Sequence, residues 1–434
     1  MFPLRPILGQ PRNFKSNRFA SSAKKVLGSG NYAIVYSATD TNQNPVALKI
    51  NDCNKHGLYH NVSDAGRIAT EIAALRVLGD FPFIAGLANC AGKPQAAEHG
   101  PTAAAIEYDP TAAAVAVALR PFRFSLQDLI SRGGGPAEGG ITYDHVRLIM
   151  KCALLGLARL HRGGAGHYDV SANNILYGEE FGASLGPQDP KRGLAALADL
   201  GLLAPAAGAR GLRVTLPNRA PEIVLHMLGL LASFTAAADV FGAGCVLADL
   251  LRLCARRARA AAGAPAVAGE GLATFGDLMD PALWDDEDEE AEPSAEAYFH
   301  VYYRIMGDPR AAPGTPAAAG AFERPLAGAP AGAVALARRM LALDPARRPT
   351  VEEVLADEFF ASMMFDGAPA DSAWGGPGDL VPAIDKIKAL VRKEDASVAL
   401  REWFTECSEC DAFGDATGDS PSTKRLKLTV EGMP

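Results

Sequence analysis

The sequence predicts an α+β fold of two lobes, a small β-rich lobe followed by a larger α-helical lobe. Residues 21–120 contain short segments in which apolar and polar residues alternate, as in strands, with one helical segment among them. From residue 125 onward the apolar residues recur at helical spacing instead. A chain of 434 residues with 48% hydrophobic content is long enough to bury the core of such a fold.

The small lobe is predicted to contain strands at 26–37, 45–50 and 115–119, with Thr41 to Asn44 as a turn between the first two. Residues 66–78 carry Ile68, Ile72 and Leu75 on one helical face. A link at 120–125 leads to the large lobe, whose predicted helices are 146–161, 236–253, 334–341 and 351–360.

The predicted boundaries follow from these changes in pattern. They are a flexible basic tail at 1–20, a small lobe at 21–120 and a large lobe at 125–362 with a low-complexity and acidic insertion at 255–295. A partly disordered C-terminal extension at 363–434 follows and includes an amphipathic segment at 384–404.

Composition excludes several classes of protein. The net charge of −8 disfavours a nucleic-acid partner, and no apolar run reaches the length of a membrane span. Seven scattered cysteines and the lack of a secretory signal favour an intracellular protein of the nucleus or cytoplasm. Cys407 and Cys410 form one C-x-x-C pair, for which plain reduced thiols are favoured over zinc.

The first motif is L-G-S-G-N-Y-A-I-V at 27–35, which lies between the two halves of the predicted strand segment 26–37. Glycines in such a hairpin let backbone N–H groups approach phosphate oxygens. The position between strand halves argues against a dinucleotide-binding turn, and no G-K-[S/T] supports a P-loop. A plain hairpin remains the alternative.

The second motif is V-A-L-K at 46–49, where Lys49 ends an apolar strand. A buried ammonium needs a carboxylate partner, and Glu71 lies on the predicted helix at 66–78. The pair could hold the α- and β-phosphates of a nucleotide, the alternative being a surface pair.

The third motif is H-Y-D-V-S-A-N-N-I-L at 167–176, and the fourth is A-D-L-G at 198–201. Asp169 can accept the proton of a substrate hydroxyl, while Asn174 and Asp199 can bind a metal ion. The alternative for the third motif is a loop with incidental polar residues, and a lone D-x-G means little.

Three further motifs are V-T-L-P-N-R-A-P-E at 214–222, D-V-F-G-A-G-C-V-L at 239–247 and D-P-A-R-R-P-T at 344–350. None of them is expected to be catalytic. Glu222 and Arg348 are candidates for a buried ion pair that ties the first of these segments to the large lobe.

All seven motifs occur in the order of the protein-kinase signature set. The chain therefore resembles a eukaryotic-type protein kinase over roughly 24–362, and its large lobe is similar to the cyclin-dependent-kinase-like (CMGC) group. The second likeness rests on V-T-L-P-N-R-A-P-E-I-V-L, on D-V-F-G-A-G-C-V-L-A-D-L-L at 239–251 and on Y-R-I-M-G-D-P at 303–309.

The resemblance implies the two-lobed protein kinase fold, with ATP and Mg²⁺ as cofactors and a protein as substrate. It implies that Lys49 anchors the phosphates with Glu71 as its partner, Asp169 is the catalytic aspartate, Asn174 and Asp199 hold magnesium, and Thr215 braces the catalytic loop, as in serine/threonine kinases. It also implies an ATP site formed by Leu27, Gly28, Ser29, Gly30, Asn31, Tyr32, Ala33, Ile34, Val35, Ala47 and Lys49, although Ala33 replaces the usual third glycine. The helix at 66–78 stands where the group binds a cyclin, so a cyclin-like or other regulatory partner is expected there.

Two departures from the family pattern affect these expectations. Tyr168 replaces an arginine that normally pairs with a phosphate on the activation loop, and Thr215 is the only hydroxyl-bearing residue between Gly201 and Glu222. Phosphorylation of this segment is therefore not expected to switch the protein on.

The second departure is Ser171, which stands where a lysine usually steadies the γ-phosphate. Loss of such a charge could cost on the order of 10²–10³ in rate. A pseudokinase that only binds ATP is therefore an alternative, and a small-molecule phosphotransferase is a weaker one. The lysine-free loop also resembles divergent viral kinases.

Overall fold

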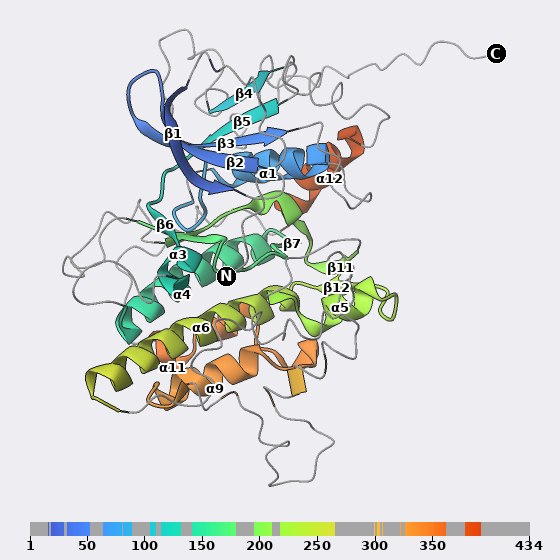
Figure 1. Cartoon of the computed structure of the whole chain (residues 1–434). Coiled ribbons are helices and arrows are strands. Elements are labelled where there is room, and N and C mark those ends of the chain that lie inside the picture. Colours follow the sequence, from blue (N-terminus) through green and yellow to red (C-terminus); the bar gives the residue numbers. More distant parts are fainter. Residues whose placement is uncertain are drawn as a thin grey trace, which may run out of the picture.

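A computed structural model describes the main elements of the chain. It covers residues 19–29, 33–52, 64–79, 81–88, 105–109, 114–131, 141–178, 195–210, 218–264, 326–361 and 378–391, with single positions at 16, 299, 302, 303, 306 and 322. A β-sheet with one helix beneath it lies above a larger set of helices (Figure 1). This arrangement confirms the predicted α+β fold of two lobes.

The small lobe is built on one antiparallel sheet in the order β1-β2-β3-β5-β4. Its strands are β1 (Ala20–Ser29), β2 (Ala33–Thr39), β3 (Pro45–Asp52), β4 (Ile106–Asp109) and β5 (Ala114–Leu119). Strand β4 was not predicted. Since β1 begins at Ala20 and Phe19 is buried, the end of the predicted N-terminal tail belongs to the fold.

The turn between β2 and β3 sets the register of these two strands. The carboxylate of buried Asp40 accepts hydrogen bonds from the backbone N–H groups of Asn42 and Asn44, both at 2.8 Å, and from the Asn44 amide at 3.0 Å. A side chain that closes its own turn in this way favours one register. That register places Lys49 opposite Val35.

Helix α1 (Asp64–Leu78) packs beneath the sheet and buries Ile68, Ile72 and Leu75, as its spacing predicts. The segment that follows crosses to the large lobe and pairs with β9 (Ala195–Leu197). Leu197 donates to the carbonyl of Phe83 at 3.0 Å, and Ala85 donates to the carbonyl of Leu197 at 2.8 Å. Backbone hydrogen bonds thus join the two lobes close to α1.

The large lobe surrounds two long buried helices. They are α4 (Tyr143–Arg162) and α6 (Ala237–Ala261), and α4 starts at a capping box between Thr142 and His145. The other helices are α3 (Leu126–Ser131), α5 (Pro221–Met227), α9 (Ala331–Met340), α10 (Val351–Leu355) and α11 (Glu358–Ala361), with single 3₁₀ turns η2 (Leu200–Leu202) and η6 (Pro345–Arg347). Short strands are β6 (Phe124–Ser125), β7 (Ala165–Gly166), β8 (Ile175–Tyr177), β10 (Ala204–Pro205), β11 (Ala207–Ala209) and β12 (Phe234–Thr235).

Two of these helices differ from the sequence prediction. Helix α6 continues to Ala261, so the first residues of the stretch predicted as an insertion from 255 are helical. The predicted helix at 351–360 is two short helices, α10 and α11, interrupted at residues 356–357. The added end of α6 is a largely exposed stretch of Ala and Arg, two strong helix formers, so intrinsic helix propensity accounts for it.

The predicted ion pair between α5 and the segment before α10 is confirmed. Arg348 forms two parallel hydrogen bonds to the Glu222 carboxylate, at 2.6 and 2.7 Å, and both side chains are buried. Arg348 also donates to the backbone carbonyls of Ala342 and Ala237, at 2.8 and 3.0 Å. The pair therefore fastens α5 to the start of α6 and to the end of the α9 segment.

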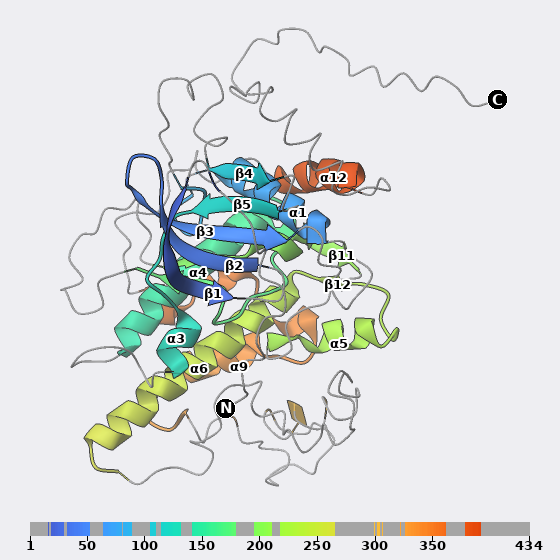
Figure 2. The ribbon, with the colours of Figure 1, turned by 45° about the horizontal axis from the view of Figure 1, so that its top comes forward.

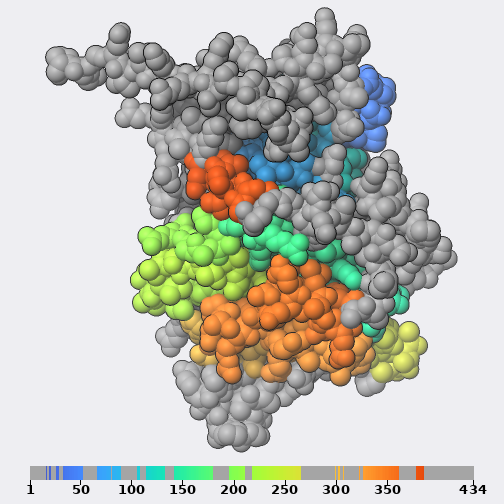
Figure 3. Space-filling view, turned by 180° about the vertical axis from the view of Figure 1, so that it is seen from behind, coloured from blue at the N-terminus to red at the C-terminus, as the bar shows by residue number. Residues whose placement is uncertain are grey.

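Helix α12 (Leu380–Val391) lies in the predicted C-terminal extension, where the amphipathic pattern was noted, and packs against α1 (Figures 1 and 2). From behind, it covers the boundary between small-lobe and large-lobe elements (Figure 3). Its start is fastened to the end of α4, where buried Arg159 holds Asp379 by two hydrogen bonds of 3.1 and 2.7 Å. The chain thus covers part of α1 with its own helix.

Two expectations from composition can be compared with the described residues. None of the helices that the structure describes combines the length and apolar character needed to cross a membrane. Cys152, Cys245 and Cys254 are buried thiols without a disulfide, and burial raises the pKa of Cys254 to about 12. Cys407 and Cys410 lie outside the described residues, so the choice between thiols and zinc stays a prediction.

We predict that Glu222→Gln lowers the free energy of unfolding by about 3–5 kcal/mol, because it leaves the buried Arg348 guanidinium without a counter-charge. Chemical denaturation measures the change. The matched control is Glu352→Gln, which removes the half-exposed pair with Arg162 at 3.7 Å and should cost at most about 1 kcal/mol. Equal losses in the two variants would show that the buried pair has no special role.

We also predict that Asp379→Asn loosens α12 from α1, since the buried Arg159 side chain loses the charge of its partner. Hydrogen–deuterium exchange should rise in residues 380–391 and in α1, with no change in α9. Unchanged exchange in residues 380–391 would mean that apolar packing alone holds this helix.

Candidate active site

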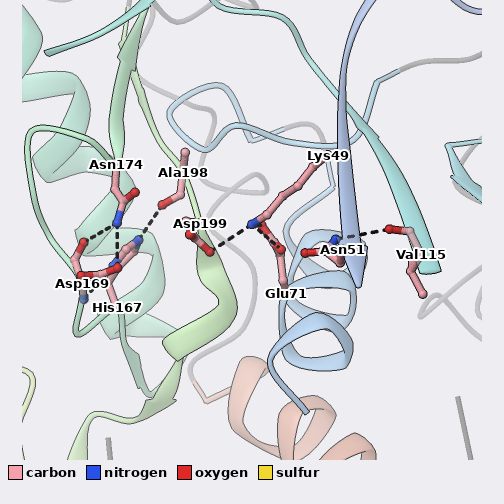
Figure 4. Close-up of polar contacts among 9 residues, drawn as sticks. All are labelled: Lys49, Asn51, Glu71, Val115, His167, Asp169, Asn174, Ala198 and Asp199. Atoms are coloured by element: carbon pink, nitrogen blue, oxygen red, sulfur yellow. Dashed lines mark hydrogen bonds and ion pairs between the residues drawn. The ribbon is translucent and has the colours of Figure 1, made fainter. Parts of the chain in front are cut away.

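Strand β3 and helix α1 bring Lys49 and Glu71 together, as the sequence predicts. The Lys49 ammonium lies 2.9 and 2.8 Å from the two oxygens of the Glu71 carboxylate, and both side chains are buried. The β2–β3 register determines the position of Lys49, and the apolar face of α1 turns Glu71 toward β3 (Figure 4).

The same ammonium reaches the large lobe. Lys49 Nζ lies 3.1 Å from Oδ1 of Asp199, which stands between β9 and the turn η2. Asp199 has φ = 59°, a left-handed conformation that non-glycine residues rarely adopt, and its side chain is 48% exposed. Such a conformation persists where neighbouring contacts enforce it, as they do here through Lys49.

Opposing charges control the protonation of this cluster. Burial lowers the pKa of Lys49, but Asp199 and Glu71 outweigh burial and raise it above its ordinary value, so the ammonium stays charged. Burial raises the pKa of Asp199, yet the Lys49 charge leaves it below its ordinary value. For Glu71, burial is the largest effect and raises the pKa while Lys49 opposes it.

The loop at 167–174, expected to be the catalytic loop, brings Asp169 and Asn174 together. The Asn174 side-chain nitrogen donates to the backbone carbonyl of Asp169 at 2.8 Å and to its Oδ2 at 2.9 Å. This contact holds the Asp169 carboxylate in one orientation. It also turns the carbonyl oxygen of the Asn174 amide away from Asp169.

His167 is a residue of this site to which sequence reasoning gave no role. Its Nδ1 accepts the backbone N–H of Asp169 at 3.1 Å, so Nε2 carries the proton and donates to the carbonyl of Ala198 at 2.9 Å. One buried imidazole thus positions both Asp169 and the residue before Asp199. Its place at the start of the third motif was the only available signal.

Asp239, at the start of α6, is the second residue whose role was missed. Its buried carboxylate accepts the backbone N–H groups of His167 at 2.8 Å and Tyr168 at 2.6 Å, and it lies 2.8 Å from Nε2 of His161. These two backbone hydrogen bonds therefore attach the loop at 167–174 to the start of α6. The signal was an aspartate that opens an otherwise apolar helix, in the D-V-F-G motif.

The glycine hairpin is described only in part. Gly28 pairs with Val35 and Ser29 with Ile34, so β1 and β2 form the expected hairpin, and Ala47 lies on the adjacent strand. A Cβ atom on Gly28 would meet no other atom within 4 Å. The neighbouring described atoms therefore do not require a glycine here, and the close approach of a nucleotide stays an expectation from the motif. Leu27, Ala33 and Ile34 belong to the two strands, while Gly30, Asn31, Tyr32 and Thr215 lie outside the described residues.

The oxygen donors of the site fit magnesium. Asp199 presents a half-exposed carboxylate and Asn174 an amide carbonyl, both hard oxygen ligands. With both carboxylates ionised, Lys49, Glu71 and Asp199 together carry one excess negative charge. Among the described residues no cluster of three or more His, Cys, Asp or Glu side chains could hold a metal by itself. Mg²⁺ takes few protein ligands and shares the rest of its coordination with phosphates, so the two oxygen donors named above are the ligands expected for it.

Ser171 is buried within the same loop, and its backbone carbonyl accepts the N–H of Asn174 at 3.0 Å. It therefore contributes to the shape of the loop. It brings no positive charge to the site.

Comparison with known proteins gives independent findings. Residues 21–360 match the family described as "Protein kinase domain". Mitogen-activated protein kinase 16 of Oryza sativa subsp. japonica is 25% identical over 370 residues, which cover 82% of this chain and 62% of that protein. Mitogen-activated protein kinase 9 of Arabidopsis thaliana is 27% identical over 350 residues, which cover 78% of this chain and 57% of that protein. The chain thus spans somewhat more than half the length of these relatives.

The lowered pKa of Asp199 predicts a pH dependence. A group whose pKa is lowered on folding stabilises the protein at pH values above its unfolded pKa, which is about 4 for an aspartate. That stabilisation is lost as the pH falls through the pKa of the folded state. Wild type should therefore lose more unfolding free energy between about pH 6 and about pH 3 than Asp199→Asn does.

The Lys49→Met background is the control, because it removes the cation that lowers this pKa. There, the burial of Asp199 is no longer opposed by the Lys49 charge, so Asp199→Asn should no longer reduce the loss of unfolding free energy between about pH 6 and about pH 3. Denaturation curves recorded at a series of pH values test both statements. If the unfolding free energies of wild type and Asp199→Asn depended on pH in the same way, the result would contradict the pairing of Asp199 with Lys49.

Proposed function

Since this chain belongs to the protein kinase family, we propose that it transfers the γ-phosphoryl group of ATP to serine or threonine hydroxyls of a protein substrate. The observation that carries the proposal is the contact of one ammonium, Lys49, with carboxylates from both lobes, beside the Asp169–Asn174 pair. These five residues are the set that phosphoryl transfer by a kinase requires.

The chain's own residues supply positioning and charge. Lys49 binds the phosphates of ATP, and Glu71 keeps the ammonium in place. Asp169 orients the acceptor hydroxyl and accepts its proton as the oxygen attacks the γ-phosphorus and the bond to the β-phosphate oxygen breaks. A Mg²⁺ ion bound to Asp199 and Asn174 would neutralise the charge of the phosphates.

The preference for serine and threonine rests on likeness. The first relatives found are mitogen-activated protein kinases, and the V-T-L-P-N-R-A-P-E segment is close to the pattern of the CMGC group. Thr215 would brace the catalytic loop as in kinases of that class. Glu222, at the end of this segment, is held to the large lobe by Arg348.

A pseudokinase that binds ATP without transferring phosphate is the second candidate, and Ser171 is the observation that favours it. The expected lysine is replaced by a buried, uncharged side chain. A loss of about 10²–10³ in rate would leave a slow enzyme rather than an inactive one.

The regulatory partner expected at residues 66–78 stays a prediction. Helix α12 already packs against α1, so a partner would bind the remaining part of α1 or displace α12. Figure 3 shows this helix on the surface between elements of the small lobe and elements of the large lobe.

We predict that Asp169→Asn reduces phosphate transfer to generic protein acceptors by at least about 10²-fold, since the hydroxyl loses its proton acceptor. ATP binding, measured by calorimetry, should persist because Lys49, Glu71 and Asp199 remain. Asp144→Asn, a surface carboxylate beside Arg147, is the matched control and should retain full activity.

A radiolabelled ATP assay separates the candidates. Phosphate on protein acceptors supports the proposal, and phosphate on small alcohols alone indicates a small-molecule phosphotransferase. ATP binding by wild type with no transfer at all would indicate the pseudokinase. Retained transfer by Asp169→Asn would overturn the assignment of the catalytic aspartate.

A further inference from the structure

Tyr168, directly before Asp169, makes a set of contacts that the proposed chemistry does not use. Its side chain is 2% exposed, and its hydroxyl donates a hydrogen bond of 2.6 Å to the backbone carbonyl of Pro205. Its ring packs edge-on against Phe234, with ring centres 5.3 Å apart at 83°. One side chain of the catalytic loop thus touches the segment that follows Asp199 and the strand that follows α5.

The segment after Asp199 is attached to the large lobe around this tyrosine. Strand β10 pairs with β7, and β11 pairs with β12. Between them, Ala206 donates to the carbonyl of Gly164 and accepts from Ala236, both at 2.7 Å. The Tyr168 hydroxyl adds a hydrogen bond that comes from the catalytic loop itself, so it connects Asp169 to this segment directly.

The space for the ring is provided by Gly166. A Cβ atom on this residue would lie 2.6 Å from Cζ of Tyr168 and 2.9 Å from its hydroxyl oxygen. Any other residue at this position would force the ring away from Pro205. The lack of a side chain at position 166 therefore makes room for the Tyr168 ring.

The backbone of Tyr168 is held in an unusual conformation. Its φ is 62°, which a bulky side chain rarely adopts, and Asp239 enforces it by accepting the N–H groups of His167 and Tyr168. This conformation directs the ring toward Pro205 and leaves Asp169 beside Asn174.

The contact is uncharged. Burial, with a smaller effect from Asp239, raises the pKa of Tyr168, so the phenol stays protonated and remains a donor. A neutral phenol cannot replace an arginine as a receptor for phosphate. Its bond to a backbone carbonyl is present whether or not the segment carries a phosphate.

We propose that Tyr168 is a positioning residue whose hydrogen bond to Pro205 fixes the segment after Asp199 relative to Asp169, in place of a phosphate-dependent contact. The inference rests on the proposed kinase function. It assigns to the loop at 167–174 a contact that orders residues 203–210, a segment without a hydroxyl-bearing side chain, independently of any phosphate.

The test compares two tyrosine-to-phenylalanine variants. Tyr168→Phe keeps the ring against Phe234 and removes only the hydroxyl. Tyr302→Phe is the matched control, because Tyr302 is also buried and donates to a backbone carbonyl, that of Leu341 at 2.7 Å, far from the catalytic loop in sequence. Both should lower the melting temperature by similar amounts.

The kinetic constants then separate positioning from stability. Tyr168→Phe should lower kcat about tenfold with an unchanged KM for ATP, while Tyr302→Phe keeps the wild-type kcat. Treating wild type with a protein phosphatase should leave kcat unchanged. An unchanged kcat in Tyr168→Phe, an equal loss in Tyr302→Phe, or inactivation by the phosphatase would each overturn the inference.

Hydrogen–deuterium exchange keeps the test independent of the proposed function. Exchange in residues 203–210 should rise in Tyr168→Phe and stay at the wild-type level in Tyr302→Phe. If wild type binds ATP but transfers no phosphate, the proposed function fails while this readout still decides whether Tyr168 holds the segment. Equal exchange in all three proteins would refute the contact.

Discussion

The contact of Lys49 with Glu71 and Asp199 is the interaction on which the rest of the site depends. It places one buried cation between carboxylates of two lobes, at distances of 2.8 to 3.1 Å. The buried Glu71 carboxylate is stabilised there by the ammonium, and the two carboxylates in turn keep the buried ammonium charged. The arrangement therefore forms only when β3, α1 and the turn at Asp199 are all in place.

Several features outside the site keep those three elements in place. The Asp40 turn determines the β2–β3 register, and Leu197 joins the segment after α1 to the large lobe through its backbone. Helix α12 packs against α1 and is attached to α4 by the pair of Arg159 and Asp379. The position of Glu71 thus depends on segments at both ends of the domain.

The large lobe orders its half of the site with buried polar groups. Asp239 accepts hydrogen bonds from the backbone of the catalytic loop, and His167 connects that loop to the residue before Asp199. At the two positions where the family pattern has a cation, this chain has the neutral residues Tyr168 and Ser171. Lys49 is consequently the cation that the described contacts place at the site, and hydrogen bonds to backbone groups do the remaining positioning.

The sequence by itself determined the fold class, the order of the elements and the chemically important side chains. Strand and helix periods are local, and the motifs carry Lys49, Glu71, Asp169, Asn174 and Asp199 at spacings that depend on the elements containing them. Tertiary structure decided what depends on contacts between distant segments, which leave no periodic trace: the place of α12 against α1, and the roles of His167, Asp239, Arg159 and the Tyr168 hydroxyl. Each of these four side chains acts through polar contacts to groups many residues away in the chain, and only folding brings the two sides within bonding distance.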